Sequence, residues 1–245
     1  LQKLRAMDAD VRLKAGRIDA PKLPLDDMNA HLLLEAGLLR LDPLNFGVAG
    51  GNIRSTIRMD ARGSEILVAT KGGHLRHEDG GWYVDGRPDH IERACEASLK
   101  ALGVEAIGLY QHHRPDPRVP YADTIGALKK LLDAGMIRLA GISNATVEQI
   151  EQADQILGGR LASVQNQFAP NFRRCEGELE HTRDRGIAFL AWSPLGGIGN
   201  ADEIERKFPA FAEVARERAV TPQQVTLAWM LAKGDNVIPI PGSSR

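Results

Sequence analysis

Residue types that can carry out chemistry follow short apolar runs at six places in the sequence. The residues at these places are Lys71, His113, Ser143 with Asn144, Gln165, Trp192 with Ser193, and Gly242 with Ser243. A lysine can pair with a carboxylate and lower the pKa of a neighbouring acid. A tryptophan offers a flat apolar face that can stack on a heteroaromatic ring. The set is suited to catalysis and to the recognition of a cofactor, although surface loops and strand ends also carry such residues for purely structural reasons.

The six apolar runs alternate with amphipathic helices after residue 64. The runs cover residues 65–70, 106–111, 137–143, 161–166, 187–192 and 236–241. This alternation predicts a parallel sheet covered by helices, with its chemistry at the carboxyl ends of the strands. A complete eight-stranded barrel usually takes about 250 residues. We therefore predict an α/β fold, an incomplete (β/α)8 TIM-type barrel with about six βα units.

The helices between these runs carry recognisable end signals. Gly103 and Gly135 follow two amphipathic segments and are suited to the C′ position of a helix. Two pairs of residues have the form of a capping box. They are Thr146 with Gln149 and Thr221 with Gln224.

Two adjacent histidines compete for the site in the segment LYQHHRPDP at 109–117. Side chains alternate in direction along a strand, so His113 shares one side with Gln111, and His112 shares the other side with Tyr110. The two histidines therefore cannot both face the interior of a barrel. The spacing alone leaves the choice between them open.

Residues 1–63 have a different composition and pattern. Of the twelve aromatic residues, only Phe46 lies before residue 64. In this part Val11 and Leu13 alternate with charged residues, and Gly37 and Gly50 lie between alternating segments where hairpin turns are expected. We predict an antiparallel β meander with one apolar and one polar face for residues 1–63, and a second domain for residues 64–245.

The composition excludes several functions. The 245 residues carry a net charge of -1, which gives no reason to expect a nucleic-acid partner. Cys95 and Cys175 are isolated, so we expect neither a disulfide framework nor a metal site. No HExxH, GxSxG or P-loop motif is present. The sequence begins with Leu1 and lacks an apolar signal core, so we expect a fragment without a leader.

Residues 64–245 resemble the aldo-keto reductase family. The matching segments, in order, are ILVATKGG, GLYQHHRPDPRVPYADTIGAL, AGMIRLAGISN, ASVQNQF, GIAFLAWSPLGG and VIPIPGSSR. The resemblance implies a (β/α)8 barrel that reduces aldehydes or ketones with NADP(H), by hydride transfer and protonation of the carbonyl oxygen. The partner it implies is a small-molecule carbonyl substrate.

The resemblance also assigns roles to individual residues. Lys71 matches the lysine that lowers the pKa of the catalytic acid. His113, just before Arg-Pro, matches the histidine that orients the carbonyl, which leaves His112 on the outer side of the barrel. The residues that match cofactor contacts are Ser143, Asn144 and Gln165 for the carboxamide, Trp192 for the nicotinamide ring, Ser193, Leu195 and Gly196 for the pyrophosphate, and Gly242, Ser243 and Ser244 for the adenosine phosphate.

The chain departs from the family at the general acid. The family acid is a tyrosine with an aspartate partner, both from DTAxxYG-type motifs upstream of the lysine strand, and no such motif is present. Loss of a general acid lowers the rate by about 10²–10⁴-fold. We therefore expect low or absent activity from this chain.

Residues 1–63 resemble the repeating strands of AsmA-like bacterial envelope proteins. In that family the strands form a long β structure associated with lipid handling, which implies membrane or lipid contact and an envelope location for this segment. A cytoplasmic location is the expectation for residues 64–245. Because the two locations conflict, we hypothesise a chimera joined near Gly63 and Ser64.

Three interpretations follow for the whole chain. The first is an impaired NADP(H)-dependent oxidoreductase, the second a non-catalytic nicotinamide-binding module, and the third an envelope protein that acts through residues 1–63. The number and specificity of the motifs favour the first. The sequence predicts neither the substrate nor the oligomeric state.

Overall fold

The computed structural model of the chain describes residues 8–18, 25–35, 38–48, 51–60, 67–197 and 200–242. The chain divides into two compact units, residues 1–66 and 67–245. The predicted junction at Gly63 and Ser64 lies outside the described residues. Within the described ranges, no helix is both long enough and apolar enough to cross a membrane.

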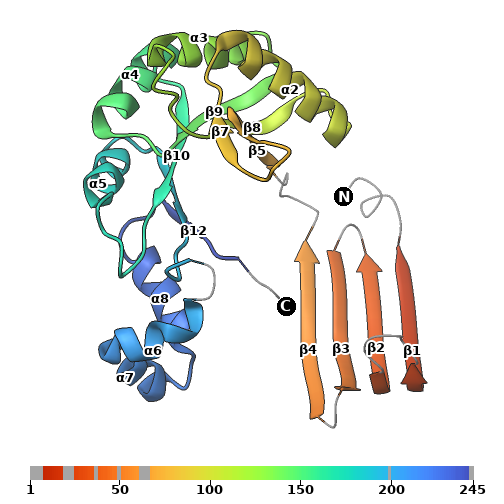
Figure 1. The fold of residues 1–245 in the computed structure, drawn as a ribbon. Helices are drawn as coiled ribbons and strands as arrows, with labels where there is room; N and C mark the ends of the chain where they lie inside the picture. Colours follow the sequence, from red (N-terminus) through yellow and green to blue (C-terminus); the bar gives the residue numbers. More distant parts are fainter. Residues whose placement is uncertain are drawn as a thin grey trace. The chain divides into compact units, whose positions relative to one another are not determined.

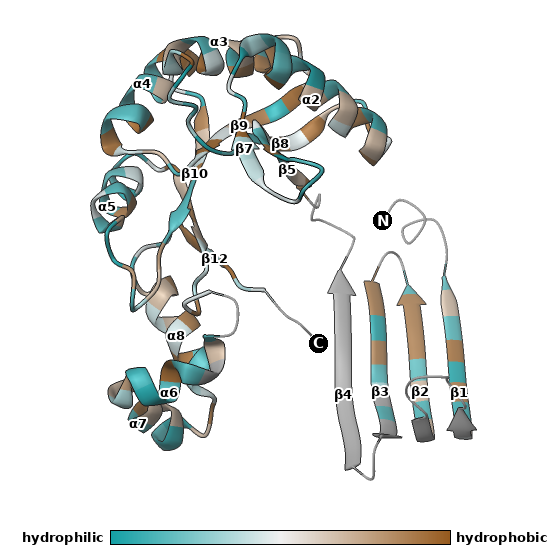
Figure 2. Cartoon of the chain, in the orientation of Figure 1, coloured by the Kyte–Doolittle hydropathy of each residue, from teal (hydrophilic) through white to brown (hydrophobic). Residues whose placement is uncertain are grey.

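The first unit contains a four-stranded antiparallel sheet, as the meander prediction required. Its strands, in spatial order, are β1 (Ala9–Ile18), β2 (Leu25–Glu35), β3 (Leu38–Val48) and β4 (Gly51–Asp60). The register places Leu32 opposite both Val11 and Leu41, so apolar side chains gather on one face. Figure 2 shows the resulting alternation of hydrophobic and hydrophilic bands on β2 and β3. Leu34 is buried, whereas Val11 on the edge strand β1 is 52% exposed. The predicted turns at Gly37 and Gly50 lie outside the described residues.

The second unit contains the six-stranded parallel sheet that the alternating pattern predicted, in the order β12-β11-β10-β9-β8-β5. The strands are β5 (Ala69–Gly72), β8 (Ile107–His112), β9 (Ile137–Ser143), β10 (Leu161–Gln167), β11 (Ala188–Trp192) and β12 (Val237–Ile240). The first strand begins at Ala69, later than the predicted residue 65. The preceding Leu67 and Val68 are exposed, because β5 lies at the edge of the sheet.

Helices connect these strands and cover one side of the sheet. They are α2 (Pro88–Leu102), α3 (Tyr121–Asp133), α4 (Val147–Leu157), α5 (Glu176–Asp184), the 3-10 helix η1 (Ala201–Glu203), α6 (Ile204–Lys207), α7 (Pro209–Arg218) and α8 (Pro222–Leu231). Figure 1 shows α2 to α5 along the outer side of the curved sheet. Both predicted capping boxes are present, at the starts of α4 and α8. Gly103 and Gly135 have positive φ just after α2 and α3, where glycine avoids the strain that a side chain would add.

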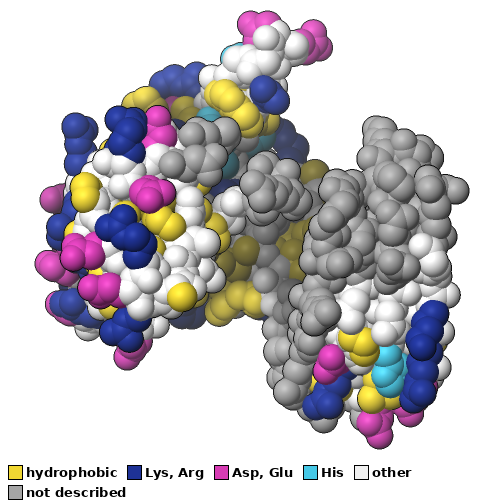
Figure 3. All heavy atoms as spheres, turned by 90° about the horizontal axis from the view of Figure 1, so that it is seen from below, with side chains coloured by type: hydrophobic (Ala, Val, Ile, Leu, Met, Phe, Trp, Pro, Cys, Tyr) yellow, Lys and Arg dark blue, Asp and Glu magenta, His cyan; other side chains and the backbone are white. Residues whose placement is uncertain are grey.

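Two clusters of buried apolar residues lie between the sheet and the helices. The larger one joins β8, β9 and β10 to α2, α3 and α4, and includes Ile91, Tyr110 and Leu128. The smaller one includes Phe189 of β11 and Met230 of α8. On the face of the second unit that Figure 3 shows, side chains of both charge signs are interspersed. The buried clusters fix the sheet and thereby the ends of its strands.

A short hairpin that the sequence pattern did not reveal follows the first parallel strand. It consists of β6 (His74–Arg76) and β7 (Trp82–Val84), which pair antiparallel. The backbone N–H of Asp85 donates to the carbonyl of Gly73 at 3.1 Å and closes the base of the hairpin. The hairpin therefore begins and ends next to the carboxyl end of β5.

Candidate active site

Gln111 and Ser163 lie on one face of the parallel sheet, the inner face. Gln111 Nε2 donates to Ser163 Oγ at 3.2 Å across this face. Gly141 lies between them, and a Cβ at Gly141 would come within 2.4 Å of Ser163 Oγ. The opposite face carries Tyr110 and Val164, which pack in the core beneath the helices. Strand alternation therefore separates a polar inner face from an apolar helical face.

Lys71 and His113 lie at the carboxyl ends of the neighbouring strands β5 and β8. Lys71 pairs in register with Gln111, so its side chain shares the inner face. The backbone N–H of His113 donates to the carbonyl of Gly72 at 2.9 Å, which ties His113 to the end of β5. Burial lowers the pKa of Lys71 below its usual range. The two residues that the sequence assigned to catalysis are thus brought to one place.

His74 on the β6–β7 hairpin is a neighbour of His113 that the sequence analysis missed. The two rings meet edge to face with centroids 4.8 Å apart, and Trp82 lies 4.9 Å from His74. Burial lowers the pKa of His113 to about 4, with further lowering by Lys71, His74 and Arg114. His113 is therefore neutral near pH 7. The position of His74 three residues after Lys71 is the only local signal that could have suggested it.

His112 lies on the other side of the strand. It is completely buried, and its ring lies 6.0 Å from the ring of Tyr121 on α3. Burial lowers the pKa of His112 to about 4, so it too is neutral near pH 7. This is the outer, helical side on which the family resemblance had placed His112.

Ser143, Asn144 and Gln165 meet at the ends of β9 and β10. Ser143 Oγ donates to the Gln165 carbonyl at 2.7 Å, and Asn144 Nδ2 donates to the His113 carbonyl at 3.0 Å. Asn144 has a φ of 57°, in the left-handed region that asparagine tolerates better than most residues. The following residue, Ala145, is held at both its N–H (3.1 Å) and its carbonyl (2.7 Å) by the side chain of Asn166.

Trp192 ends β11, and its ring nitrogen is buried without a hydrogen-bond partner among the described residues. Trp192 pairs in register with Gln167, two residues beyond Gln165, so by alternation its side chain shares the inner face. After it, Ser193 has a φ of 52° and its carbonyl accepts from the N–H of Gly196 at 2.9 Å. Trp192 and Ser193 thus begin a tight loop at the same end of the sheet.

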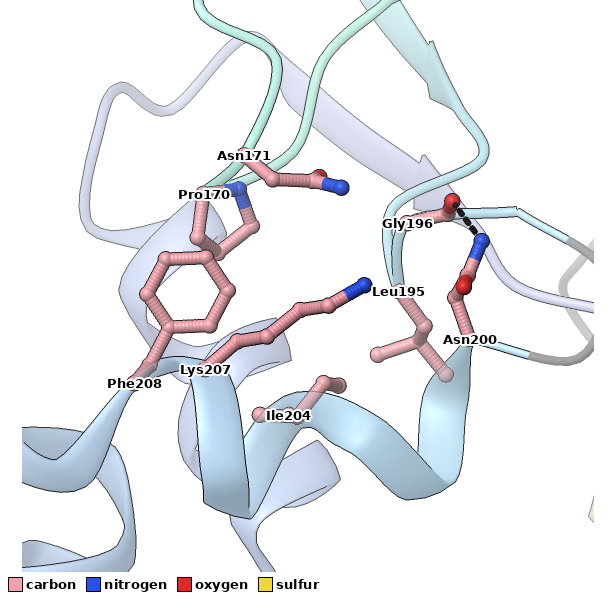
Figure 4. A pocket seen from close by; sticks show the side chains of 8 residues that line it. All are labelled: Pro170, Asn171, Leu195, Gly196, Asn200, Ile204, Lys207 and Phe208. Atoms are coloured by element: carbon pink, nitrogen blue, oxygen red, sulfur yellow. Dashed lines mark hydrogen bonds between the residues drawn. The ribbon is translucent and has the colours of Figure 1, made fainter.

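The loop after Trp192 forms one wall of a pocket. The pocket is lined by Pro170, Asn171, Leu195, Gly196, Asn200, Ile204, Lys207 and Phe208 (Figure 4). Asn200 Nδ2 donates to the Gly196 carbonyl at 2.9 Å, and a Cβ at Gly196 would lie 3.2 Å from Asn171 Nδ2. The Lys207 side chain extends into the pocket toward Asn171 and Leu195. Sequence reasoning found Leu195 and Gly196 but missed Lys207, which lies on a short helix without a recognisable motif.

The C-terminal candidate residues are only partly described. Gly242 follows β12 and is exposed. Ser243 and Ser244 lie outside the described residues. Apart from Gly242, the described candidates lie at or just beyond the carboxyl ends of β5, β8, β9, β10 and β11.

The chain has three tyrosines. Tyr110 and Tyr121 lie on the helical side of the sheet, and Tyr83 lies on the β6–β7 hairpin. Tyr110 is buried on the helical face, where its hydroxyl donates to the Ile91 carbonyl at 3.5 Å. Tyr121 lies on α3 beside His112, and burial raises the pKa of both Tyr110 and Tyr121. Tyr83 stacks on His77 in the hairpin at 4.2 Å.

The fold and the inner face define an α/β protein of the barrel class, with polar groups collected at the carboxyl ends of its strands. Residues 50–245 match the model of the Aldo/keto reductase family, and the chain belongs to that family. A weaker match relates residues 1–71 to the AsmA family. These findings confirm the fold class and the family predicted from the sequence.

Individual relatives agree with this assignment. The NADP(+) aldo-keto reductase yakc of Schizosaccharomyces pombe is 31% identical over 235 residues, covering 83% of this chain and 68% of that protein. The crystal structure of the thermostable aldo-keto reductase Tm1743 with the inhibitor epalrestat is 31% identical, with a TM-score of 0.59 over 65% of this chain and 57% of that one. An aldo/keto reductase from Klebsiella pneumoniae, solved with NADP and acetate, is 25% identical, with a TM-score of 0.58 over 73% of this chain and 60% of that one.

The chain spans 57% to 68% of the length of the curated relatives it matches.

Proposed function

We propose that the second unit binds NADP(H) and holds the carbonyl group of an aldehyde or ketone beside it, as an oxidoreductase of the aldo-keto reductase type. The observation that carries this proposal is the position of Lys71, His113, Ser143, Gln165 and Trp192. They lie at the carboxyl ends of five neighbouring strands of one parallel sheet. Family membership and the NADP named for two relatives support the same function.

The residues present fit a nicotinamide cofactor. The side-chain amide of Gln165 makes no hydrogen bond to another described residue and is free for a carboxamide, as is Asn144 Oδ1. Trp192 offers its ring face for stacking. The loop of Ser193, Leu195 and Gly196 has a cation beside it, Lys207, which suits a pyrophosphate. When bound, NADPH supplies a hydride.

His113 and Lys71 would act on the carbonyl oxygen. A neutral imidazole can donate one hydrogen bond, and that bond would orient the carbonyl. The nearby ammonium of Lys71 favours the negative charge that develops on the oxygen. Protonation of this oxygen needs an acid. Tyr110 and Tyr121 lie on the helical side of the sheet and Tyr83 stacks on His77 in the hairpin, which supports low turnover. The same observation favours a second candidate function, a nicotinamide-binding module without catalysis.

Titration of the purified chain with NADPH, followed by tryptophan fluorescence, tests the proposal. Quenching should be saturable and should largely disappear in Trp192→Phe. The matched variant Trp229→Phe, which removes a tryptophan of α8 that packs on Phe168 and Phe211, should retain it. Absence of saturable quenching would refute the proposal. If NADPH binds, its oxidation with an aromatic aldehyde separates the two candidates, because only the oxidoreductase turns over.

We further propose that residues 1–63 and 64–245 are two domains of a chimeric or misassembled reading frame, joined near Gly63 and Ser64. The shift in aromatic content and the two family matches support this proposal. Sequencing the native locus across this junction tests it, and a single uninterrupted reading frame would contradict it.

A further inference from the structure

A buried carboxylate lies close to the proposed carbonyl site, in the loop after β8. The Asp116 side chain is 1% exposed. It accepts hydrogen bonds from Arg118 Nε (2.9 Å) and Nη2 (3.0 Å), from the Arg118 backbone N–H (3.0 Å) and from the Gly86 backbone N–H (3.1 Å). The hydrogen bonds from the Arg118 side chain are the main cause that holds the pKa of Asp116 well below its usual range. The carboxylate is therefore ionised throughout the neutral pH range.

These hydrogen bonds join two segments that are distant in sequence. Arg118 Nη2 also donates to the carbonyl of Val84, the last residue of β7. Thr124 Oγ1 of α3 donates to the Gly86 carbonyl at 2.6 Å. A Cβ at Gly86 would lie 2.9 Å from the Asp116 Cβ, so the close approach requires glycine. The end of the β6–β7 hairpin is thus fastened to the loop after β8 and to α3.

Each of the two segments carries one ring of the His74–His113 contact. His113 lies three positions before Asp116, and its backbone is held to Gly72 at 2.9 Å. His74 begins the hairpin, and the ring of Trp82 at its other strand packs against it. The Nδ1 atom of His74 is buried without a partner among the described residues. The backbone hydrogen bond from the Asp85 N–H to the Gly73 carbonyl also holds the base of the hairpin.

We propose that Asp116 and Arg118 are positioning residues that latch the β6–β7 hairpin to the loop after β8 and thereby hold His74 against His113. The hairpin then forms a wall of the carbonyl site and keeps water from the His113 ring. The importance of this wall for catalysis rests on the proposed function, whereas the latch itself is a feature of the fold. Asp116 acts through the hairpin and touches no substrate.

Titration of the histidine ring protons by NMR in the absence of cofactor tests the latch. Burial is the largest cause of the low pKa of His113. The titratable or charged groups that interact with it are Lys71 on β5, His74 on β6, Arg114 in the loop and the adjacent His112. Opening the hairpin in Asp116→Asn should hydrate the ring and raise the His113 pKa from about 4 by about one unit or more. Loss of the negative charge alone would act in the opposite direction, so the sign of the shift distinguishes the two effects.

Asp85→Asn is the matched control. Asp85 also pairs with an arginine, Arg87, at 2.7 Å, and its carboxylate lies 3.8 Å from His90 Nδ1, so these contacts stay within residues 85–90 and do not reach the loop after β8. This variant should leave the His113 pKa near the wild-type value. Equal shifts in Asp85→Asn and Asp116→Asn would overturn the proposal, as would an unchanged or lowered His113 pKa in Asp116→Asn.

If Asp116→Asn fails to fold, Arg118→Gln tests the latch instead. The Arg118 side chain is 69% exposed, so its replacement leaves the core intact. The variant removes the side-chain hydrogen bonds from Arg118 to Asp116 and to the Val84 carbonyl. The His113 pKa should again rise, and hydrogen exchange at the Asp85 amide should accelerate. A folded Arg118→Gln with neither change would overturn the latch. Failure of NADPH binding in the separate fluorescence titration would refute the proposed function and leave this result standing.

Discussion

Replacement of Asn166 by alanine should destabilise the second unit strongly, although Asn166 touches neither cofactor nor substrate in the proposed site. Asn166 is 2% exposed, and its side chain forms hydrogen bonds with both the N–H and the carbonyl of Ala145. Ala145 is itself 3% exposed and follows Ser143 and Asn144 directly. Asn166→Ala would leave two buried backbone groups without partners in the segment that carries these site residues.

The size of the effect follows from the two lost hydrogen bonds. A buried backbone group left without a partner costs about 1–3 kcal/mol. With two such groups, we expect the free energy of unfolding to fall by about 2–5 kcal/mol. At a urea m-value of about 2 kcal/mol/M, this corresponds to a midpoint lower by roughly 1–2.5 M.

Urea unfolding followed by tryptophan fluorescence measures the stability of the second unit. All three tryptophans, Trp82, Trp192 and Trp229, belong to residues 67–245, so the signal reports the second unit alone. Asn171→Ala is the matched control, because Asn171 is exposed and its loss should change stability by less than about 0.5 kcal/mol. A midpoint for Asn166→Ala within experimental error of the control would refute the reasoning.

Four other predictions concern stability. Gly141→Ala should cost about 1–3 kcal/mol because its Cβ would come within 2.4 Å of Ser163 Oγ. Gly126 lies in α3, and a Cβ there would meet no atom within 4 Å, so Gly126→Ala should stabilise the second unit by about 0.5–1 kcal/mol. Equal urea midpoints for Gly141→Ala and Gly126→Ala would contradict these two predictions. Thr146→Ala should cost about 1 kcal/mol by removing the capping box of α4, measured in the same way. Stability should fall as pH drops from 6.5 toward 4, because burial lowers the pKa of His112 to about 4 and the unfolded chain binds the proton first. His112→Leu should show a weaker pH dependence in urea unfolding, and an unchanged one would count against this cause.

Local sequence patterns were sufficient for most secondary structure. The predicted strand 137–143 coincides with β9, and the capping box of Thr146 with Gln149 starts α4 as expected. These signals succeed because capping and strand alternation depend on residues a few positions apart. The β6–β7 hairpin was missed because its strands contain three residues each, too few for a periodic pattern.

Contacts between distant segments were outside the reach of such patterns. The carboxylate of Asp116 bonds the N–H of Gly86, thirty positions earlier, and neither residue stands in a motif that indicates the other. The contact between His74 and His113 was missed for the same reason, because it depends on a hairpin that the sequence pattern did not show. The residues at strand ends, together with the family resemblance that selected His113, therefore gave the proposed catalytic pair but not the neighbours that surround it.

The sequence by itself determined the order of the strands and which polar residues end them, because each strand and its following helix are defined by nearby residues. Only the tertiary structure decided which side of each strand faces the helices. Alternation provides two sides but does not distinguish them. The packing of α2 and α3 against β8 buries Tyr110 and His112 on the helical side, and this places Gln111 on the inner face and the His113 ring against the hairpin.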